Sequence, residues 1–302
     1  MESELLNKKK WFILGFCGLV IFTLIIQAFV SSRSVQQKGT WIWDASSIVV
    51  QGRESLAFAE QQGVTKIYLY IDQRVAPQDY ARFIQEARRN EIQVEALGGD
   101  PSWGRKDKRP YIKEFTDWVS SYNTNVTEEE RFSGIHLDIE PYLLPEWKND
   151  RKRVVEEWLS NMDFVARDVQ LLGDLDVSVD LPFWVHLIEV PGYDDYFVST
   201  WMLKRFDTVV LMDYRNQAEG EDGIISNALA VLTEASTMEN KSVIVGVEMA
   251  KSSEGDQVSF FEKGHQVMMR ELAITQENLN RYSAFEGVAI HGFSEWMASY
   301  HR

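Results

Sequence analysis

The 302-residue sequence predicts an α/β fold, a (β/α)8 barrel preceded by one N-terminal transmembrane helix. Three observations predict it. Eight short runs rich in Val, Ile and Tyr alternate with helical patterns from residue 40 onward, which is typical of βα units around a parallel sheet. About 260 residues follow the first forty, the usual length of one closed barrel. A separate apolar run lies near the N-terminus.

That apolar run covers residues 11–30, directly after three lysines at 8–10. At about 1.5 Å per residue it spans a hydrocarbon core of about 30 Å. Lysines before the span favour a cytoplasmic N-terminus at residues 1–10. We therefore expect a signal-anchor at 11–30, a polar linker at 31–39 and an extracellular barrel at 40–302, held at the cell membrane by a single pass. A cleaved signal peptide is the alternative.

The eight expected strands have the length and composition of buried parallel strands. They cover residues 40–44, 66–71, 93–99, 134–141, 176–182, 207–214, 242–249 and 287–296. Helices are expected at 78–90 and 153–171, and Thr127 to Glu130 has the spacing of a capping box. An open doubly wound sheet is the alternative, but it carries a Gly-rich loop after its first strand, and Trp41-Ile-Trp-Asp-Ala-Ser has none. A TIM barrel is therefore expected.

Composition and charge exclude several classes of partner. The formal net charge is −15, and so acidic a surface repels phosphate, which argues against nucleic acid as a partner. The one cysteine, Cys17, lies in the apolar run, so the barrel has no disulfide and no Cys-based zinc site. The five histidines have no metal-binding spacing. We expect neither a metal nor a cofactor.

The functional site of such a barrel lies at the C-terminal ends of its strands. Carboxylates and aromatic residues gather at these positions: Trp43, Asp44, Asp138, Glu140, Tyr142, Asp180, Asp213, Tyr214, Arg215, Glu248 and Trp296. Indoles stack on the C–H faces of sugar rings, and carboxylates supply the acid, base or nucleophile for a glycosidic bond. The mixture therefore predicts a polysaccharide or oligosaccharide substrate.

The most informative segment ends the fourth strand. Side chains alternate along a strand, so His136, Asp138 and Glu140 point to one face, the barrel interior. An Asp beneath a Glu can hold or share its proton and raise the pKa of the Glu carboxyl into the range of a general acid. We expect His136 to be a buried hydrogen-bonding residue. The alternative is that both acids only pair with a cation at the barrel end.

Together these motifs resemble glycoside hydrolase family 18, the chitinase-like TIM barrels, of which the chain would be a divergent member. The family pattern DxxDxDxE corresponds to Ser133, His136, Asp138 and Glu140, SxGG to the run from Ala96 to Gly99, MxYD to the run from Met212 to Arg215, and the closing tryptophan to Trp296.

The resemblance implies a role for each matched residue. Glu140 would be the general acid, Asp138 would orient the 2-acetamido group of the substrate as internal nucleophile, and Tyr214 would hydrogen-bond the reacting sugar. Trp296 would form the floor of the subsite. Ser133, His136 and Arg215 replace acids of the pattern, which puts this substrate-assisted route in question.

A second mechanism is therefore open. Glu248 ends the seventh strand, where many retaining glycosidases that share this layout place a glutamate nucleophile. The alternative is that Glu248 binds substrate or forms a salt bridge, with Arg215 as the partner.

These inferences predict a membrane-anchored extracellular glycoside hydrolase acting on an amino-sugar polysaccharide, either a cell-wall glycan or an exopolysaccharide. A catalytically inactive carbohydrate-binding barrel and an envelope scaffold protein are the alternatives.

Overall fold

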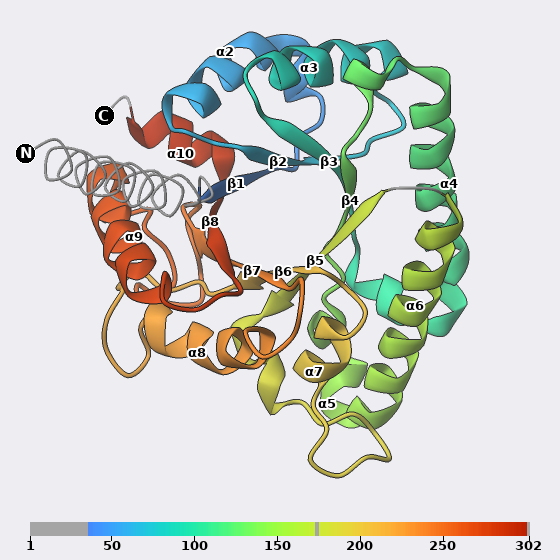
Figure 1. Cartoon of the computed structure of the whole chain (residues 1–302), viewed down its shortest axis with the longest axis vertical. Coiled ribbons are helices and arrows are strands. Elements are labelled where there is room, and N and C mark those ends of the chain that lie inside the picture. Colours follow the sequence, from blue (N-terminus) through green and yellow to red (C-terminus); the bar gives the residue numbers. More distant parts are fainter. Residues whose placement is uncertain (1–35, 173–174, 301–302) are drawn as a thin grey trace, which may run out of the picture. The chain divides into compact units, whose positions relative to one another are not determined.

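The computed structural model describes residues 36–172 and 175–300. Eight parallel strands form a closed barrel in sequence order, and helices surround it (Figure 1). The strands are β1 Gln37–Ile42, β2 Lys66–Tyr70, β3 Gln93–Gly98, β4 Gly134–Leu137, β5 Asp176–Pro182, β6 Thr208–Met212, β7 Ser242–Glu248 and β8 Phe285–His291. The predicted (β/α)8 barrel is confirmed, and the open sheet is excluded because β1 pairs with β8.

The described helices follow the strands as the alternation predicts. They are α2 Ser47–Gln61, α3 Pro77–Arg89, α4 Arg109–Asn125, α5 Glu146–Asn149, α6 Arg151–Leu172, α7 Val198–Leu203, α8 Ile224–Ala235, α9 His265–Leu279 and α10 Phe293–Tyr300. Helix α3 begins at Pro77, whose fixed φ suits a first helical residue. The capping box at Thr127 and Glu130 is present and begins a short 3-10 turn.

Two strands, β4 and β8, end four and five residues earlier than the sequence predicts. Strand β4 ends at Leu137, because Glu140 has ψ 67° and Pro141, which lacks an N–H group, starts a 3-10 turn. Strand β8 ends at His291, because Gly292 adopts φ 74° and turns the chain into α10. Residues beyond Gly292 therefore do not continue the strand.

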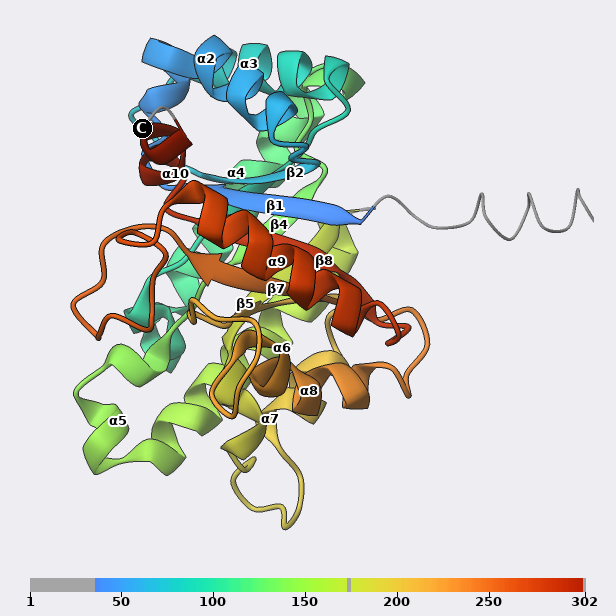
Figure 2. The same ribbon diagram turned by 90° about the vertical axis from the view of Figure 1, so that its left-hand side faces the viewer.

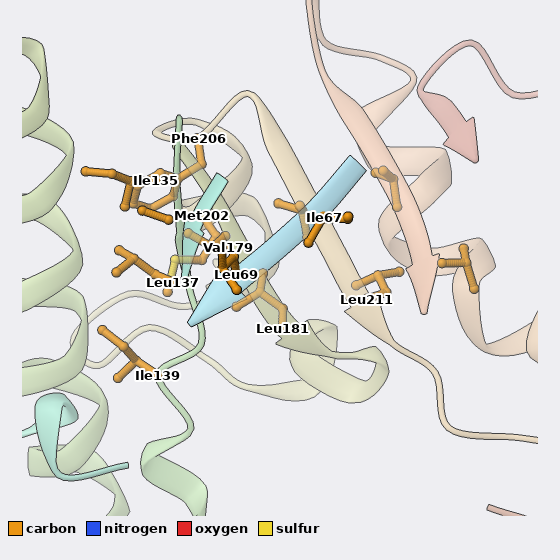
Figure 3. Close-up of a cluster of buried hydrophobic side chains, with 14 of the residues drawn as sticks. Ile67, Leu69, Ile135, Leu137, Ile139, Val179, Leu181, Met202, Phe206 and Leu211 are labelled. Atoms are coloured by element: carbon orange, nitrogen blue, oxygen red, sulfur yellow. The ribbon is translucent and has the colours of Figure 1, made fainter. Parts of the chain in front are cut away.

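Alternation along the strands separates two sets of buried side chains. One set points outward against the helices, including Ile67, Ile135 and Leu211, and forms the main core (Figure 3). The other points into the barrel, where Trp41 and Tyr68 belong to a small apolar cluster. Polar inward-facing side chains lie beside this cluster, and most of the site is built from them.

The predicted membrane segment lies outside the described residues, as do residues 1–10 and most of the linker. Across residues 36–172 and 175–300, every helix is too short or too polar to cross a bilayer. Strand β1 begins at Gln37, within the last residues assigned to the linker. In the side view α9 lies beside β8 and α10 lies near β1 (Figure 2).

Candidate active site

The C-terminal end of β4 places Asp138 and Glu140 at the barrel mouth, the end at which the parallel strands terminate. The backbone N–H of Asp138 donates to the carbonyl oxygen of Gly98 at 3.1 Å. A Cβ at Gly99 would lie 1.9 Å from the carbonyl oxygen of Asp138, so only glycine lets the two strand ends approach this closely. The glycine pair that ends β3 therefore fixes the backbone of Asp138.

The carboxyl group of Asp138 is buried near two other acids. Its Oδ1 atom has no hydrogen-bond partner among the described residues. Burial raises the pKa of Asp138 well above its usual value, and the proximity of the carboxyl groups of Asp180 and Glu140 raises it further. Asp138 is therefore suited to holding or sharing a proton next to Glu140.

The carboxyl group of Glu140 is partly exposed at the mouth. Its Oε2 atom accepts a hydrogen bond from the hydroxyl group of Tyr142. Burial raises the pKa of Glu140, and the Tyr142 hydrogen bond and the nearby charge of His291 partly offset this rise. Because Tyr142 donates to Oε2, the proton of the neutral acid lies on Oε1. These are the properties that a general acid requires.

Beneath these acids, hydrogen-bonded polar side chains cross the barrel interior. Lys66 Nζ lies 2.5 Å from Glu95 Oε1 in a buried ion pair. Ser178 Oγ lies 2.5 Å from Glu95 Oε2 and 2.6 Å from His136 Nδ1. An ionised carboxylate only accepts hydrogen bonds, so Ser178 donates to Glu95. It follows that His136 Nδ1 carries a proton and donates to Ser178.

The opposite side of the His136 ring contacts Asp180. His136 Nε2 lies 2.7 Å from Asp180 Oδ2, and Trp41 Nε1 lies 2.9 Å from the same oxygen and 3.2 Å from Nε2. An indole N–H only donates, so Nε2 accepts. Burial lowers the pKa of His136 to about 3, so the ring is neutral. A proton on Asp180 must then occupy the short contact with Nε2.

Asp180 is consequently a neutral acid in the barrel interior. Burial raises the pKa of its carboxyl group well above the usual value, which agrees with this protonation. Only 4% of the residue is exposed. The carboxyl group faces His136 and Trp41 beneath the mouth, and its predicted contact with substrate stays a prediction.

The end of β6 presents Tyr214 to the mouth and Asp213 to the opposite side. The Tyr214 ring is partly exposed and lies 5.8 Å from that of His291. Burial and the surrounding carboxylates, Glu248 first among them, raise the pKa of Tyr214 well above its usual value, so its hydroxyl group stays neutral. Tyr214 can therefore donate a hydrogen bond to a ligand at the mouth.

Asp213 is fully buried, and its Oδ1 atom accepts a hydrogen bond from Asn227 Nδ2 of α8 at 3.0 Å. Burial raises the pKa of Asp213 to about 8. The Asp213 carboxyl group lies against α8, whereas Tyr214 lies at the mouth. The predicted role of Asp213 in substrate binding stays a prediction.

Asp44 and Arg215 make local contacts in loops at the mouth. Asp44 Oδ1 accepts a hydrogen bond from the backbone N–H of Ser46 at 3.0 Å. Arg215 Nε lies 2.9 Å from Asp222 Oδ2, and its guanidinium group packs over Phe183. Contact of Asp44 or Arg215 with substrate stays a prediction.

Aromatic residues at the mouth form two groups. Beside Glu140, the ring of Tyr142 lies 5.0 Å from Trp184 and 6.2 Å from Trp147. On the other side, Trp43 follows β1 with 36% of its surface exposed, and its ring lies 5.4 Å from that of Tyr70. Exposed ring faces of this kind suit sugar rings.

Trp296 lies elsewhere. It belongs to α10 and is 0% exposed; its Nε1 atom donates to His265 Nδ1 at 3.0 Å, and its ring packs against Phe58 at 5.1 Å. Neither face of the indole is free for a sugar. The chain turns at Gly292 before Trp296 is reached, so the indole lies in α10, and its predicted role as the floor of a subsite stays a prediction.

Both oxygens of Glu248 are engaged. Oε2 lies 2.8 Å from His291 Nδ1, and Oε1 accepts a hydrogen bond from the backbone N–H of Ala250 at 2.6 Å. The ion-pair partner of Glu248 is thus His291, whereas Arg215 pairs with Asp222. A nucleophilic role for Glu248 stays a prediction, and it would require one of these contacts to break.

A cavity of about 420 Å³ lies next to Tyr70, on the side of the mouth that carries Trp43. Tyr70, Gly98, Trp103 and Tyr111 are among its lining residues. The larger cavity of about 890 Å³ lies between α3 and α4, and Asp138 and Glu140 are among the lining residues of neither cavity. In the described part of the chain no three His, Cys, Asp or Glu side chains are grouped to hold a metal ion.

Five residues of the site are not among the functional candidates that the sequence suggests. These are Trp41, Lys66, Glu95, Ser178 and His291. Each belongs to the inward-facing set of its strand, as His136, Asp138 and Glu248 do. Charged and polar residues in inward register on several strands are a signal that could have identified this set.

Comparisons with known proteins add the following. No family model matches the sequence, and no curated protein matches it. Solved structures do match. A chitinase from Chromobacterium violaceum has a TM-score of 0.55 at 12% identity, covering 88% of this chain and 98% of that one.

Two further structures are similar. The PgaB (BpsB) glycoside hydrolase domain from Bordetella bronchiseptica has a TM-score of 0.54 at 11% identity, covering 88% of this chain and 96% of that one. A GH18 chitinase from Cycas revoluta, solved in complex with (GlcNAc)3, has a TM-score of 0.52 at 14% identity. The match covers 87% of this chain and 96% of that one. At these identities the chain shares the barrel fold of GH18 chitinases and related glycoside hydrolases.

Proposed function

We propose that the chain is a glycoside hydrolase of an amino-sugar polysaccharide, anchored in the membrane with its barrel outside the cell. One observation supports this most strongly. Glu140 is a partly exposed acid with a raised pKa, a hydrogen bond from Tyr142 on one oxygen and, behind it, Asp138, whose Oδ1 atom is buried. A general acid for glycosidic cleavage needs this combination of access and retained proton.

In the proposed reaction, Glu140 transfers the proton on Oε1 to the glycosidic oxygen as the bond to the anomeric carbon breaks. The carbonyl oxygen of the substrate's own 2-acetamido group attacks the anomeric carbon and forms a cyclic intermediate. Asp138 and Glu140 share one proton, which lies on Glu140 in the reactive state, so Asp138 accepts the acetamido N–H as a carboxylate and offsets the positive charge that develops. Water then attacks the anomeric carbon, the bond from that carbon to the acetamido oxygen breaks, and the Glu140 carboxylate takes a proton from the water.

The substrate-assisted route is preferred to a Glu248 nucleophile for a geometric reason. Both oxygens of Glu248 are engaged, by Ala250 N–H and His291, whereas Asp138 Oδ1 has no hydrogen-bond partner among the described residues. The neutral hydroxyl group of Tyr214 is a further donor for the reacting sugar.

A polymeric substrate fits the aromatic surfaces on either side of the acids. The rings of Trp43 and Tyr70 lead toward the cavity that Trp103 and Tyr111 line. The structurally similar chitinase from Cycas revoluta binds (GlcNAc)3, which supports an N-acetylated sugar as the first substrate to test. The extracellular location is proposed from the lysine-led apolar run at residues 11–30 alone.

Product release from a panel of N-acetylated and de-N-acetylated amino-sugar polymers tests the proposal, with wild type, Glu140→Gln and Glu60→Gln compared. Glu60 is exposed on α2 and serves as the control. We expect Glu140→Gln to lose at least about a hundredfold in rate, the usual contribution of a general acid, while it retains affinity. Equal turnover by wild type and Glu140→Gln would contradict the proposal. Binding without turnover by wild type would instead favour a catalytically inactive carbohydrate-binding barrel.

A further inference from the structure

Trp43 is an exposed indole at the mouth, and a hydrogen bond to His291 holds it in place. Its Nε1 atom donates to His291 Nε2 at 2.9 Å, while one side of the ring packs against Tyr70. Because an indole N–H can only donate, His291 Nε2 must be unprotonated when this bond exists. The orientation of Trp43 therefore depends on the protonation of His291.

The other nitrogen of the same ring is fixed by Glu248. His291 Nδ1 lies 2.8 Å from Glu248 Oε2, and an ionised carboxylate only accepts, so Nδ1 carries the proton. Glu248 is itself held by the backbone N–H of Ala250. A Cβ at Gly292 would lie 2.6 Å from that same nitrogen, so the glycine after His291 gives this chain of bonds its space.

Glu248, His291 and Trp43 thus form one hydrogen-bonded series across β7, β8 and the end of β1. Its direction is fixed: Trp43 donates to His291, and His291 donates to Glu248. The series requires a neutral imidazole. A second proton on His291 would place two N–H groups against each other at 2.9 Å and break the bond to Trp43.

The charges around His291 favour that second proton. Glu248 on β7, Asp180 on β5 and Glu140 after β4 are the acids that face it, and the Tyr214 ring lies beside it. Burial lowers the pKa of His291, but the hydrogen bond to Glu248 and the negative charge of Glu248 outweigh this effect and raise the pKa above its usual value. His291 therefore gains its second proton at a higher pH than an ordinary imidazole does.

We propose that Trp43 is the sugar platform of the active site and that His291, anchored by Glu248, holds its indole in place only while the imidazole is neutral. This inference rests on the proposed function and adds a positioning role for Glu248 and His291. Acidification releases the indole, so sugar affinity falls as His291 gains its proton.

The first test needs no sugar. The titration of His291 is followed by NMR on the full chain with isotope-labelled histidine, and its signal among the five histidines is assigned with His291→Asn. The N–H group of Trp43 donates only to the neutral His291 ring and so stabilises that form. Loss of this hydrogen bond in Trp43→Phe should therefore raise the pKa of His291 by about half to one unit. Trp118→Phe, on α4, is the control and should leave it unchanged. An unchanged or lower pKa in Trp43→Phe overturns the inference.

The second test measures affinity for an N-acetylated chito-oligosaccharide by calorimetry across the same pH range, in a Glu140→Gln background that prevents turnover. We expect binding to weaken about three- to tenfold as His291 gains its proton, and this dependence to disappear in Trp43→Phe but persist in Trp118→Phe. The same pH dependence in both variants overturns the inference. Absence of binding at every pH contradicts the proposed function, and the histidine titration still decides the inference.

Discussion

The hydroxyl group of Tyr142 offers a direct way to shift the proton of Glu140. Tyr142→Phe removes the hydrogen bond to Oε2 but keeps the ring that packs against Trp184 and Trp147. This bond stabilises the ionised carboxylate and so lowers the pKa of Glu140. The substitution should therefore raise that pKa.

The size of the shift follows from the strength of the bond. A hydrogen bond to a charged group contributes about 1.5–3 kcal/mol, and one pKa unit corresponds to about 1.4 kcal/mol. Glu140 is partly exposed, so water replaces part of the lost bond. We expect a rise of about one unit. A general acid must be protonated to act. The pH above which the rate falls should therefore rise by the same amount.

The assay is the pH profile of kcat/KM on a soluble N-acetylated oligosaccharide. Tyr193→Phe is the control, since Tyr193 is exposed and its ring lies against Tyr196 in the loop after β5. The high-pH limb should move in Tyr142→Phe and stay in place in Tyr193→Phe. A limb that does not move, or that moves to lower pH, would refute the assignment of Glu140 as the acid.

Three further predictions concern stability. Burial raises the pKa of Asp213 from 3.8 to about 8, so the folded state keeps a proton that the unfolded state releases, and stability falls as pH rises across this window. Asp213→Asn should raise Tm at about pH 7.5 and have less effect near pH 4, as calorimetry can measure; equal effects at both would contradict this. Gly99→Ala, whose Cβ would lie 1.9 Å from a carbonyl oxygen, should cost about 2–4 kcal/mol in urea unfolding, whereas Gly52→Ala, with its nearest contact at 3.4 Å, should cost less than about 1 kcal/mol. Lys66→Met leaves Glu95 buried without its cation and should cost about 3–5 kcal/mol. The double variant Lys66→Met/Glu95→Leu should unfold at a higher urea concentration than Lys66→Met alone, because it removes the unpaired charge. If the double variant unfolds at a lower urea concentration, an unpaired buried charge on Glu95 is not the cause of the lost stability.

Local patterns in the sequence were sufficient to predict the strands. The alternation of apolar runs and helical patterns predicts all eight, because each strand is buried on both faces and is flanked by turn residues. The same alternation places Asp138 and Glu140 on one face, and the structure brings both to the mouth.

The structure differs from the sequence-based expectations where a single backbone angle changes the direction of the chain. The apolar pattern of β8 runs on past His291, but the positive φ of Gly292 ends the strand and carries Trp296 into a helix. Asp213 was assigned to the mouth by position along the strand, although it is one residue out of register with Tyr214 and faces α8.

The interior contacts depend on distant parts of the chain. Trp41 meets Asp180 across a separation of 139 residues, and Trp43 meets His291 across 248. No local pattern encodes such pairs. They follow from barrel closure and from the relative register of strands, which only the folded structure supplies.

A structure of the Glu140→Gln variant with a bound N-acetylated oligosaccharide tests the central claim most directly. The account predicts that the side chain at 140 contacts the glycosidic oxygen, that Asp138 accepts the acetamido N–H, and that a sugar ring lies on Trp43. A sugar chain bound elsewhere on the barrel, or one with Glu248 against the anomeric carbon and residue 138 out of reach, would contradict it.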